Sequence, residues 1–89
     1  MELKKYSKGL VGVRMTINDR MEKGFGNICD DCNEEITGDS VYIPVLNQSF
    51  CISCGEKFLE SHKLYSEDEK YQKSNLLIYF PELCAEYTK

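Results

Sequence analysis

The chain has 89 residues, of which 42% are hydrophobic, so it can form one small domain with a limited core. No stretch approaches the ~20 apolar residues of a membrane span, and charged residues interrupt the start where a signal peptide would have its apolar run, so we expect a cytoplasmic protein without membrane partners. The net charge of −4 combines +3 in residues 1–28 with −7 in residues 29–89, which makes direct nucleic-acid binding by the larger part unfavourable.

Residues 1–26 are predicted to form an N-terminal strand segment of a single domain that spans residues 1–89. Apolar side chains alternate with small or polar ones, which is the period of a half-buried strand, at Val11, Val13, Met15 and Ile17. Asn18-Asp19 predicts a turn after that strand, and the glycines between residues 24 and 27 predict a flexible loop.

Four cysteines form the strongest signal in the chain. They make two C-x-x-C pairs with eighteen residues between them, which is the spacing of a tetrahedral zinc site. A fifth cysteine makes the total odd, which does not favour a secreted disulfide framework. Two redox dithiols are the alternative, but such motifs belong to a βαβ setting. Four thiolates leave no open coordination position, so we expect one structural Zn²⁺ held by Cys29, Cys32, Cys51 and Cys54.

The segment between the cysteine pairs is predicted to be a β-hairpin. A turn at residues 37–39 leads into a strand over residues 41–46, and Asn47-Gln48 reverses the chain towards Cys51. Pro44 removes a backbone donor, so this strand is expected at an edge of the sheet. Residues 56–65 favour a helix, with an apolar face of Phe58, Ser61 or His62, and Tyr65.

Two folds accept paired C-x-x-C motifs: a zinc ribbon, in which strands follow both pairs, and a treble clef, in which the second pair opens a helix. Asn33 suits the left-handed position that ends a zinc knuckle. Because the chain after Gly55 has helical rather than strand periodicity, we expect a small α+β zinc-stabilised domain with a treble clef (knuckle, β-hairpin, helix) over residues 27–65. A helix start also directs its positive dipole end towards the thiolates.

Residues 66–89 are predicted to form a helical C-terminal extension. Ser66 and Glu69 have the spacing of a capping box. Pro81 either kinks one helix or opens a short last one. Apolar residues recur at helical intervals at Leu76, Leu77, Phe80, Leu83, Cys84 and Tyr87.

The cysteine pairs, with Asp30-Asp31 inside the first and Ile52-Ser53 inside the second, carry a family resemblance. Residues 27–65 resemble treble-clef zinc fingers of the GATA and LIM kind, and are similar to small treble-clef proteins of phages and prophages of Gram-positive bacteria. The resemblance implies the four paired cysteines as zinc ligands. DNA-binding members carry basic residues after the fourth ligand, whereas this chain has Glu56-Lys57-Phe58-Leu59-Glu60, so nucleic-acid recognition is not carried over.

Two other residues could take part in chemistry. His62 is the only histidine and lies eight residues past Cys54, about 12 Å along a helix, which is too far to replace that cysteine as a ligand. It is therefore expected at the surface or at the core edge. Cys84 lies in the apolar stripe of the last segment and is expected to be a small buried side chain rather than a reactive thiol.

The sequence favours a non-catalytic protein-protein interaction module over an enzyme. An acidic and aromatic surface would meet a protein partner, such as a basic nucleic-acid-binding host protein. The phage resemblance implies an adaptor or an inhibitor of a host system, for example of the anti-CRISPR type. The alternative is a small transcription-associated zinc finger that contacts phosphate through its basic N-terminal segment, with Lys4, Lys5, Lys8, Arg14 and Arg20.

Overall fold

A four-stranded antiparallel sheet forms the centre of the molecule, and the computed structural model describes all residues 1–89. The strands follow one another in the sheet in the order of the chain: β1 (Glu2–Lys5), β2 (Val11–Met15), β3 (Ser40–Ile43) and β4 (Gln48–Cys51). Val13 lies opposite both Leu3 and Tyr42. The sheet therefore has β1 and β4 at its edges and the residues between the cysteine pairs in its second half.

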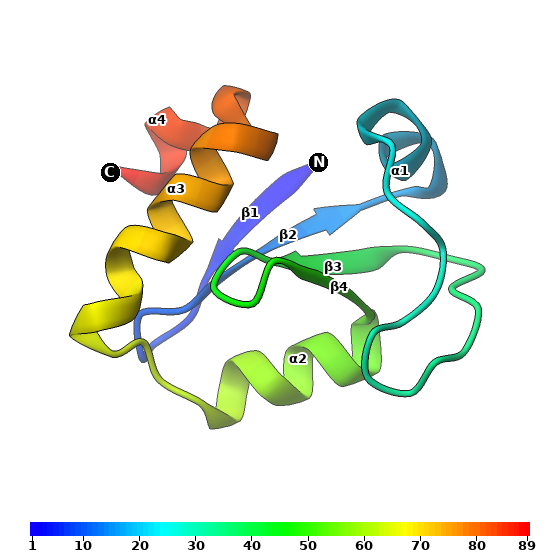
Figure 1. The fold of residues 1–89 in the computed structure, drawn as a ribbon, viewed down its shortest axis with the longest axis horizontal. Helices are drawn as coiled ribbons and strands as arrows, with labels where there is room; N and C mark the ends of the chain where they lie inside the picture. The colour runs from blue at the N-terminus through cyan, green and yellow to red at the C-terminus, as the bar shows by residue number, and fades with distance from the viewer.

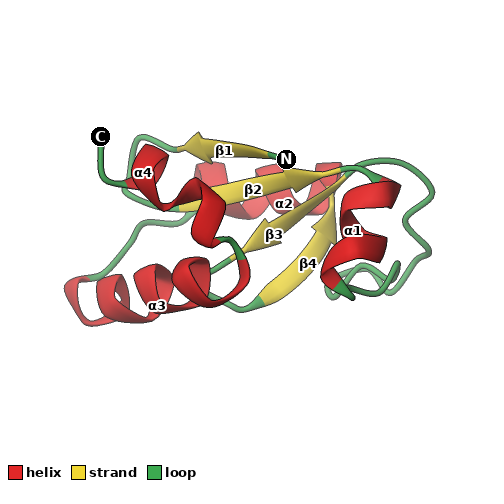
Figure 2. Cartoon of the chain, turned by 90° about the horizontal axis from the view of Figure 1, so that it is seen from above, coloured by secondary structure: helices red, strands yellow, loops and turns green.

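Helices cover both faces of this sheet (Figures 1 and 2). Helix α2 (Ile52–Ser61) lies on one face, and α3 (Glu69–Tyr79) with the short α4 (Cys84–Tyr87) lies on the other. Helix α1 (Ile17–Lys23) follows β2 at the end of the sheet, and 3-10 turns at Ser66–Asp68 and Pro81–Leu83 flank α3. The chain is thus a small α+β protein, and none of its helices combines the length and apolar character needed to cross a bilayer.

The sheet separates two hydrophobic cores. The first, which we call the metal-side core, lies beneath α2 and consists of Leu10, Cys29, Ile36, Val41, Ile43, Phe50 and Leu59. The second, which we call the aromatic core, lies beneath α3 and consists of Val13, Met15, Tyr42, Leu76, Phe80 and Leu83. Because both faces are covered, β2 exposes only Arg14 and is not the half-buried strand that its alternation predicts.

Two glycines bring α2 close to the sheet. A Cβ at Gly12 of β2 would lie 2.7 Å from Cδ1 of Leu59, and a Cβ at Gly55 of α2 would lie 3.0 Å from Cβ of Val41. Gly55 is buried in the first half of the helix, so the buried face of α2 runs through Gly55 and Leu59. The predicted face through residues 58, 61 or 62 and 65 is wrong by part of a turn, because Ser61, His62 and Tyr65 are exposed.

Helix α3 is attached to the sheet by two buried amide side chains. Gln72 accepts a hydrogen bond from the backbone N–H of Val11 at 3.1 Å and donates to the carbonyl of Gly9 at 3.3 Å. Asn75 donates to the carbonyl of Pro44 at 2.8 Å. These bonds satisfy backbone groups at the start of β2 and just after β3, where the sheet ladder ends.

The turn predicted at Asn18-Asp19 is wrong, and the strand that was expected to reach Ile17 ends at Met15. Thr16 is instead the N-cap of α1: its hydroxyl accepts from the N–H of Asp19 at 3.2 Å, and the Asp19 carboxylate accepts from the N–H of Thr16 at 2.9 Å. This reciprocal pair is a capping box. The first strand, β1, has no counterpart among the predicted elements.

The hairpin was predicted in the right place, but its first strand differs in length and position. Strand β3 ends at Ile43, and residues 44–47 form the turn, in which Asn47 has a φ of 54°. Pro44 therefore lies outside the ladder, and β3 pairs with both β2 and β4. The expected edge position is wrong because the strand stops before the proline instead of including it.

The C-terminal region is helical, as predicted, but its capping differs. Ser66 makes no capping hydrogen bond, and the residues from Ser66 to Asp68 form a 3-10 turn before α3. Pro81 occupies the first position of the second 3-10 turn, so it opens a short last segment, which was one of the two alternatives. Of the predicted stripe, Leu76, Phe80 and Leu83 are buried, whereas Leu77 is 49% exposed.

Candidate metal centre

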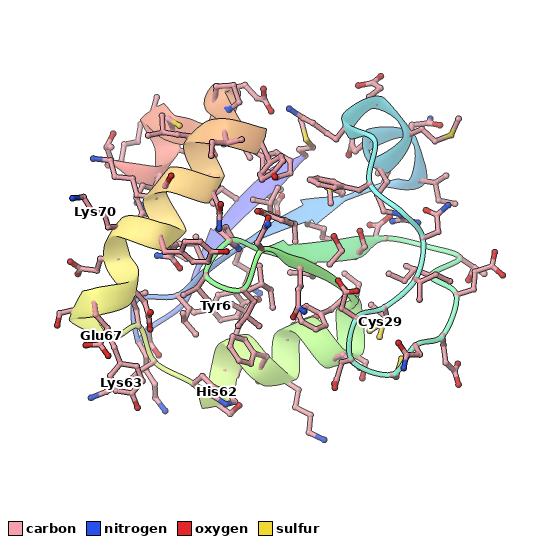
Figure 3. All side chains as sticks on the ribbon, in the orientation of Figure 1. Tyr6, Cys29, His62, Lys63, Glu67 and Lys70 are labelled. Carbon is pink, nitrogen blue, oxygen red and sulfur yellow. The ribbon has the colours of Figure 1, made fainter.

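Four cysteine side chains from three parts of the fold meet at one end of α2. Cys29 and Cys32 lie in the loop between α1 and β3, Cys51 ends β4, and Cys54 lies in the first turn of α2. Their sulfur atoms all lie within 4.8 Å of one another. The structure therefore brings together the four cysteines that the spacing singled out, and Figure 3 shows Cys29 where the loop passes the start of α2.

The first cysteine pair lies in a tight backbone turn. The N–H of Asn33 donates to the carbonyl of Cys29 at 2.9 Å, and the N–H of Cys29 donates to the carbonyl of Glu34 at 2.9 Å. Asn33 has a φ of 62°, the left-handed conformation expected for the end of a knuckle. This conformation lets the chain reverse within a few residues, so that both thiols of the pair face the same point.

The loop is fastened to the edge of the sheet by Asp30. Its backbone N–H donates to the carbonyl of Ser49 at 2.9 Å, and its carboxylate accepts from the N–H of Ser49 at 2.9 Å. These two bonds use the outward-facing backbone groups of β4 at Ser49 and fix the first pair beside the strand that carries Cys51. The edge of the sheet is covered there.

Arg20 of α1 is a supporting residue that the sequence analysis did not identify. Its side chain is fully buried, with Nε donating to Oδ1 of Asn27 at 2.7 Å and Nη2 donating to the carbonyl of Ile36 at 3.1 Å. It thereby holds both ends of the cysteine loop, whose strands also meet at the Ile28–Glu35 bridge. A lone arginine in an amphipathic segment carries no signal for this role, because its partners are backbone and amide oxygens.

The thiols of Cys29 and Cys54 differ in pKa because their surroundings differ. Burial raises the pKa of the Cys29 thiol, but backbone N–H groups of Cys32, Cys51 and Asp31 donate to its sulfur, and the pKa falls to about 7. The pKa of Cys54 is raised above its ordinary value, chiefly because a hydrogen bond with Cys51 favours the protonated thiol. Without a cation, one thiolate is therefore favoured at the expense of its neighbours.

This donor set fits a soft divalent cation. Thiolate ligands select zinc and related metals, and a tetrahedral ion with Zn–S bonds of ~2.3 Å needs sulfurs ~3.8 Å apart, which the observed separations allow. A dication would also relieve the competition among neighbouring thiols for one negative charge. The four cysteines could thus hold one metal ion, plausibly zinc.

The remaining residues with chemical potential lie outside the cluster. His62 follows the end of α2, far from Cys29 (Figure 3), and is exposed; its ring stacks on Phe58 with the centroids 4.2 Å apart. Its Nδ1 lies 3.1 Å from the carbonyl of Phe58. Cys84 is half-buried in α4, and its thiol lies 3.7 Å from the carbonyl of Phe80.

Comparison with known proteins leaves this site to be interpreted from its own geometry, since no protein-family model, curated protein or solved structure matches the chain.

Proposed function

We propose that the chain is a non-catalytic protein-interaction module whose metal side is a treble clef around one structural Zn²⁺. Cys29, Cys32, Cys51 and Cys54 are the ligands in this proposal. The observation that carries it is the closed donor set: four sulfurs within 4.8 Å of one another supply every position of a tetrahedral ion. No position is left for water or substrate, so the metal stabilises the fold and does not activate a reactant.

The local geometry supports the treble clef over the zinc ribbon. The first pair lies in a knuckle that ends at Asn33, the β3–β4 hairpin follows, and the second pair spans the start of α2. Cys51 is the N-cap residue of α2, so the free N–H groups of the first helical turn lie next to the metal ligands. A ribbon would place a strand where this helix stands.

The charge of the metal side supports a protein partner. Residues 24–56 contain no lysine or arginine, and the carboxylates among them cannot attract phosphate. Four thiolates around one Zn²⁺ add a further charge of −2. We propose that the partner is a basic protein in the cytoplasm and that this chain acts on it as an adaptor or as an inhibitor of a host system. The resemblance to small phage zinc proteins supports this proposal.

Contact with nucleic acid through residues 1–28 is a weaker alternative. Arg20 is fully buried, so the expectation that it meets phosphate is wrong. Arg14 forms an ion pair with Asp39 at 3.1 Å. Only the lysines of the first eight residues remain as contacts, and a gel-shift titration at low salt decides whether they bind a duplex.

Two measurements test the proposed function. Elemental analysis of protein purified under reducing conditions should find one zinc per chain, retained in Cys84→Ser and lost in Cys29→Ser. Tagged wild type should then retain a partner from the source cell that elutes with salt, whereas the Cys29→Ser variant should not. A folded protein without metal contradicts the zinc site, and a zinc protein that retains no partner contradicts the interaction function.

A further inference from the structure

A groove runs along one flank of α2, next to the metal centre. Its apolar lining comes from Leu46 in the β3–β4 turn, Phe50 of β4, and Cys54 and Phe58 of α2, and its volume is about 440 Å³. Asp30 and Asp31 line it at the metal end. We call this feature the α2 groove. Figure 3 shows His62, which lines the groove, at the opposite end of α2 from Cys29.

The charged side chains of the α2 groove are unevenly distributed, with carboxylates at the metal end and Lys57 in the middle of α2. Asp31 is exposed and forms no ion pair, and its carboxylate is near enough to the Cys54 thiol to raise the pKa of that thiol, whereas Asp30 is engaged with the N–H of Ser49. Lys57 lines the groove from α2, beyond the acidic end, and His62 lies past it. A ligand that places a cation beside Asp31 and keeps away from Lys57 is therefore favoured electrostatically.

The apolar part of the groove is accessible. Leu46 is 37% exposed, and Phe58 is half-buried against the ring of His62, whereas Phe50 is buried beneath them with 5% of its surface exposed. An aliphatic or aromatic side chain could bury this surface further, and apolar anchors in such depressions dominate the energetics of protein recognition. The groove thus offers one apolar site beside one anionic site.

Strand addition cannot be the mode of binding at this edge of the sheet. The N–H and carbonyl of Ser49 on β4 are already bonded to Asp30. An extended peptide would have to break these bonds to pair with β4, and in doing so would release the cysteine loop. Recognition in the α2 groove must therefore come from side chains of the ligand.

We propose that the α2 groove binds a short peptide segment of a partner protein in which a lysine or arginine stands next to an apolar side chain. The cation lies beside Asp31, and the apolar side chain lies on Leu46 and Phe58. This rests on the proposed function, because it names the surface through which the module meets its partner. Nucleic acid is disfavoured in the same groove by the carboxylates at its end.

The test is a titration of the zinc-loaded full chain, labelled with ¹⁵N, by two matched synthetic heptapeptides followed in NMR spectra. One peptide alternates arginine and leucine, and the other alternates glutamate and leucine. The arginine peptide should shift the amides of Asp31, Leu46 and Phe58, with a Kd that rises with salt. The proposal would be overturned if the glutamate peptide caused shifts as large as those of the arginine peptide. It would also be overturned if the arginine peptide shifted only amides on the outer face of α3, or none at all.

Three exposed positions supply the variants. Asp31→Asn should weaken binding of the arginine peptide about twofold to fivefold, the range of an exposed ion pair. Lys57→Glu should strengthen binding, a change of sign that a merely structural effect would not produce. Glu34→Gln is the matched control, because Glu34 belongs to the same acidic loop but does not line the groove, and its Kd should equal that of the wild type. Equal affinity in all three variants would contradict the groove.

Failure of the peptide titration can be distinguished from failure of the proposed interaction function. If the tagged chain retains a salt-sensitive partner while the arginine peptide fails to bind or binds elsewhere, the groove is wrong and the interaction function stands. If Asp31→Asn keeps its zinc by elemental analysis but loses the peptide, the loss arises at the groove and not at the metal centre.

Discussion

On one face of the sheet, α2 packs over the metal-side core next to four cysteine thiols, whereas on the other face α3 packs over the aromatic core through large side chains and amide hydrogen bonds. Phe25 packs against the aromatic core, and its ring and those of Tyr42 and Phe80 are in mutual contact, with centroids 5.3–5.9 Å apart. The metal-side core consists of mainly aliphatic residues and ends at the cysteine loop. One face is thus stabilised by direct contacts alone, whereas the other, in the proposed function, is stabilised by a metal ion as well.

Helix α1 connects the two faces. Arg20 holds the cysteine loop through Asn27 and Ile36, and Lys23, one turn later, reaches the other face, where it donates to the carbonyl of Tyr79 at 2.7 Å and pairs with Glu82 at 2.6 Å. The sheet is also shared, because Val41 and Tyr42 are neighbours in β3 and point into different cores. Because α1 and β3 contact both cores, disruption of one face can reach the other through them.

Removal of the metal should have the largest effect. Structural zinc provides about 10–16 kcal/mol of apparent binding energy in finger peptides, which matches or exceeds the whole stability of a small domain, about 5–15 kcal/mol. We expect a chelator to abolish amide exchange protection in α2 and the cysteine loop first, and in α3 later or less completely. Hydrogen exchange read by mass spectrometry measures this order.

Cys84→Ser is the matched control for that experiment, since it removes a thiol outside the cluster. Its exchange should equal that of the wild type in both faces. If the chelated wild type loses protection in α2 and α3 together, the two faces form one cooperative unit and the proposed division between them is wrong.

A substitution at Gln72 should produce the next largest effect, on the opposite face. Gln72→Leu leaves the N–H of Val11 and the carbonyl of Gly9 without their side-chain partner, and an unpaired buried polar group costs about 1–3 kcal/mol. We expect a loss of about 2–3 kcal/mol in urea unfolding of the zinc-loaded protein. Ser74→Ala, at an exposed position of the same helix, should lose nothing, and a similar loss in both variants would contradict a specific role of the amide.

The metal cluster was predictable from the sequence because its chemistry is local. The spacing of two C-x-x-C pairs indicated which four thiols would lie together, and Asn33 after Cys32 indicated a left-handed residue that the structure contains. The hairpin was predictable for the same reason, since its turn residues lie next to one another in the chain.

The attachment of α3 could not be predicted in this way. Gln72 and Asn75 bind backbone groups that lie 61 and 31 residues away, and polar residues in a helix ordinarily face solvent. The two capping motifs show a related ambiguity. Thr16 and Asp19 form a capping box that the alternation of β2 concealed, whereas Ser66 and Glu69 have the same spacing and form none. The spacing of a capping motif alone therefore cannot show whether a helix begins there.

Close packing on the metal side gives the third prediction. Gly12→Ala introduces a methyl group 2.7 Å from Leu59 and 3.0 Å from Val41, so α2 or its leucine must move. Overpacking of this kind costs about 1–3 kcal/mol, and we expect a value near the lower end, because Leu59 can adjust the end of its side chain. Gly26→Ala is the control, because nothing lies within 4 Å of its added Cβ. An unchanged urea midpoint in Gly12→Ala would show that α2 is loosely attached even with metal bound.

The ion pair between Lys23 and Glu82 should have the smallest effect, and it tests whether α1 transmits changes between the faces. The Lys23 hydrogen bond lowers the pKa of Glu82 below its ordinary 4.5, so the folded state favours the ionised carboxylate. The contribution of the ionised Glu82 carboxylate to the free energy of unfolding is fully present above pH 4.5 and disappears as the pH falls through the lower pKa of the folded state. The ion pair should contribute less than about 1 kcal/mol at neutral pH, so the stability deficit of Lys23→Met should shrink by that amount in acid. The part of the deficit that comes from the lost hydrogen bond to the carbonyl of Tyr79 should remain. Acid also protonates the thiols, but it does so in both proteins, so the pH-dependent part of their difference in urea unfolding isolates the ion pair. Because Lys23 contacts only the aromatic side, zinc affinity in a competition titration should stay unchanged; a weaker affinity would mean that α1 couples the two faces more strongly than the direct contacts of Lys23 account for.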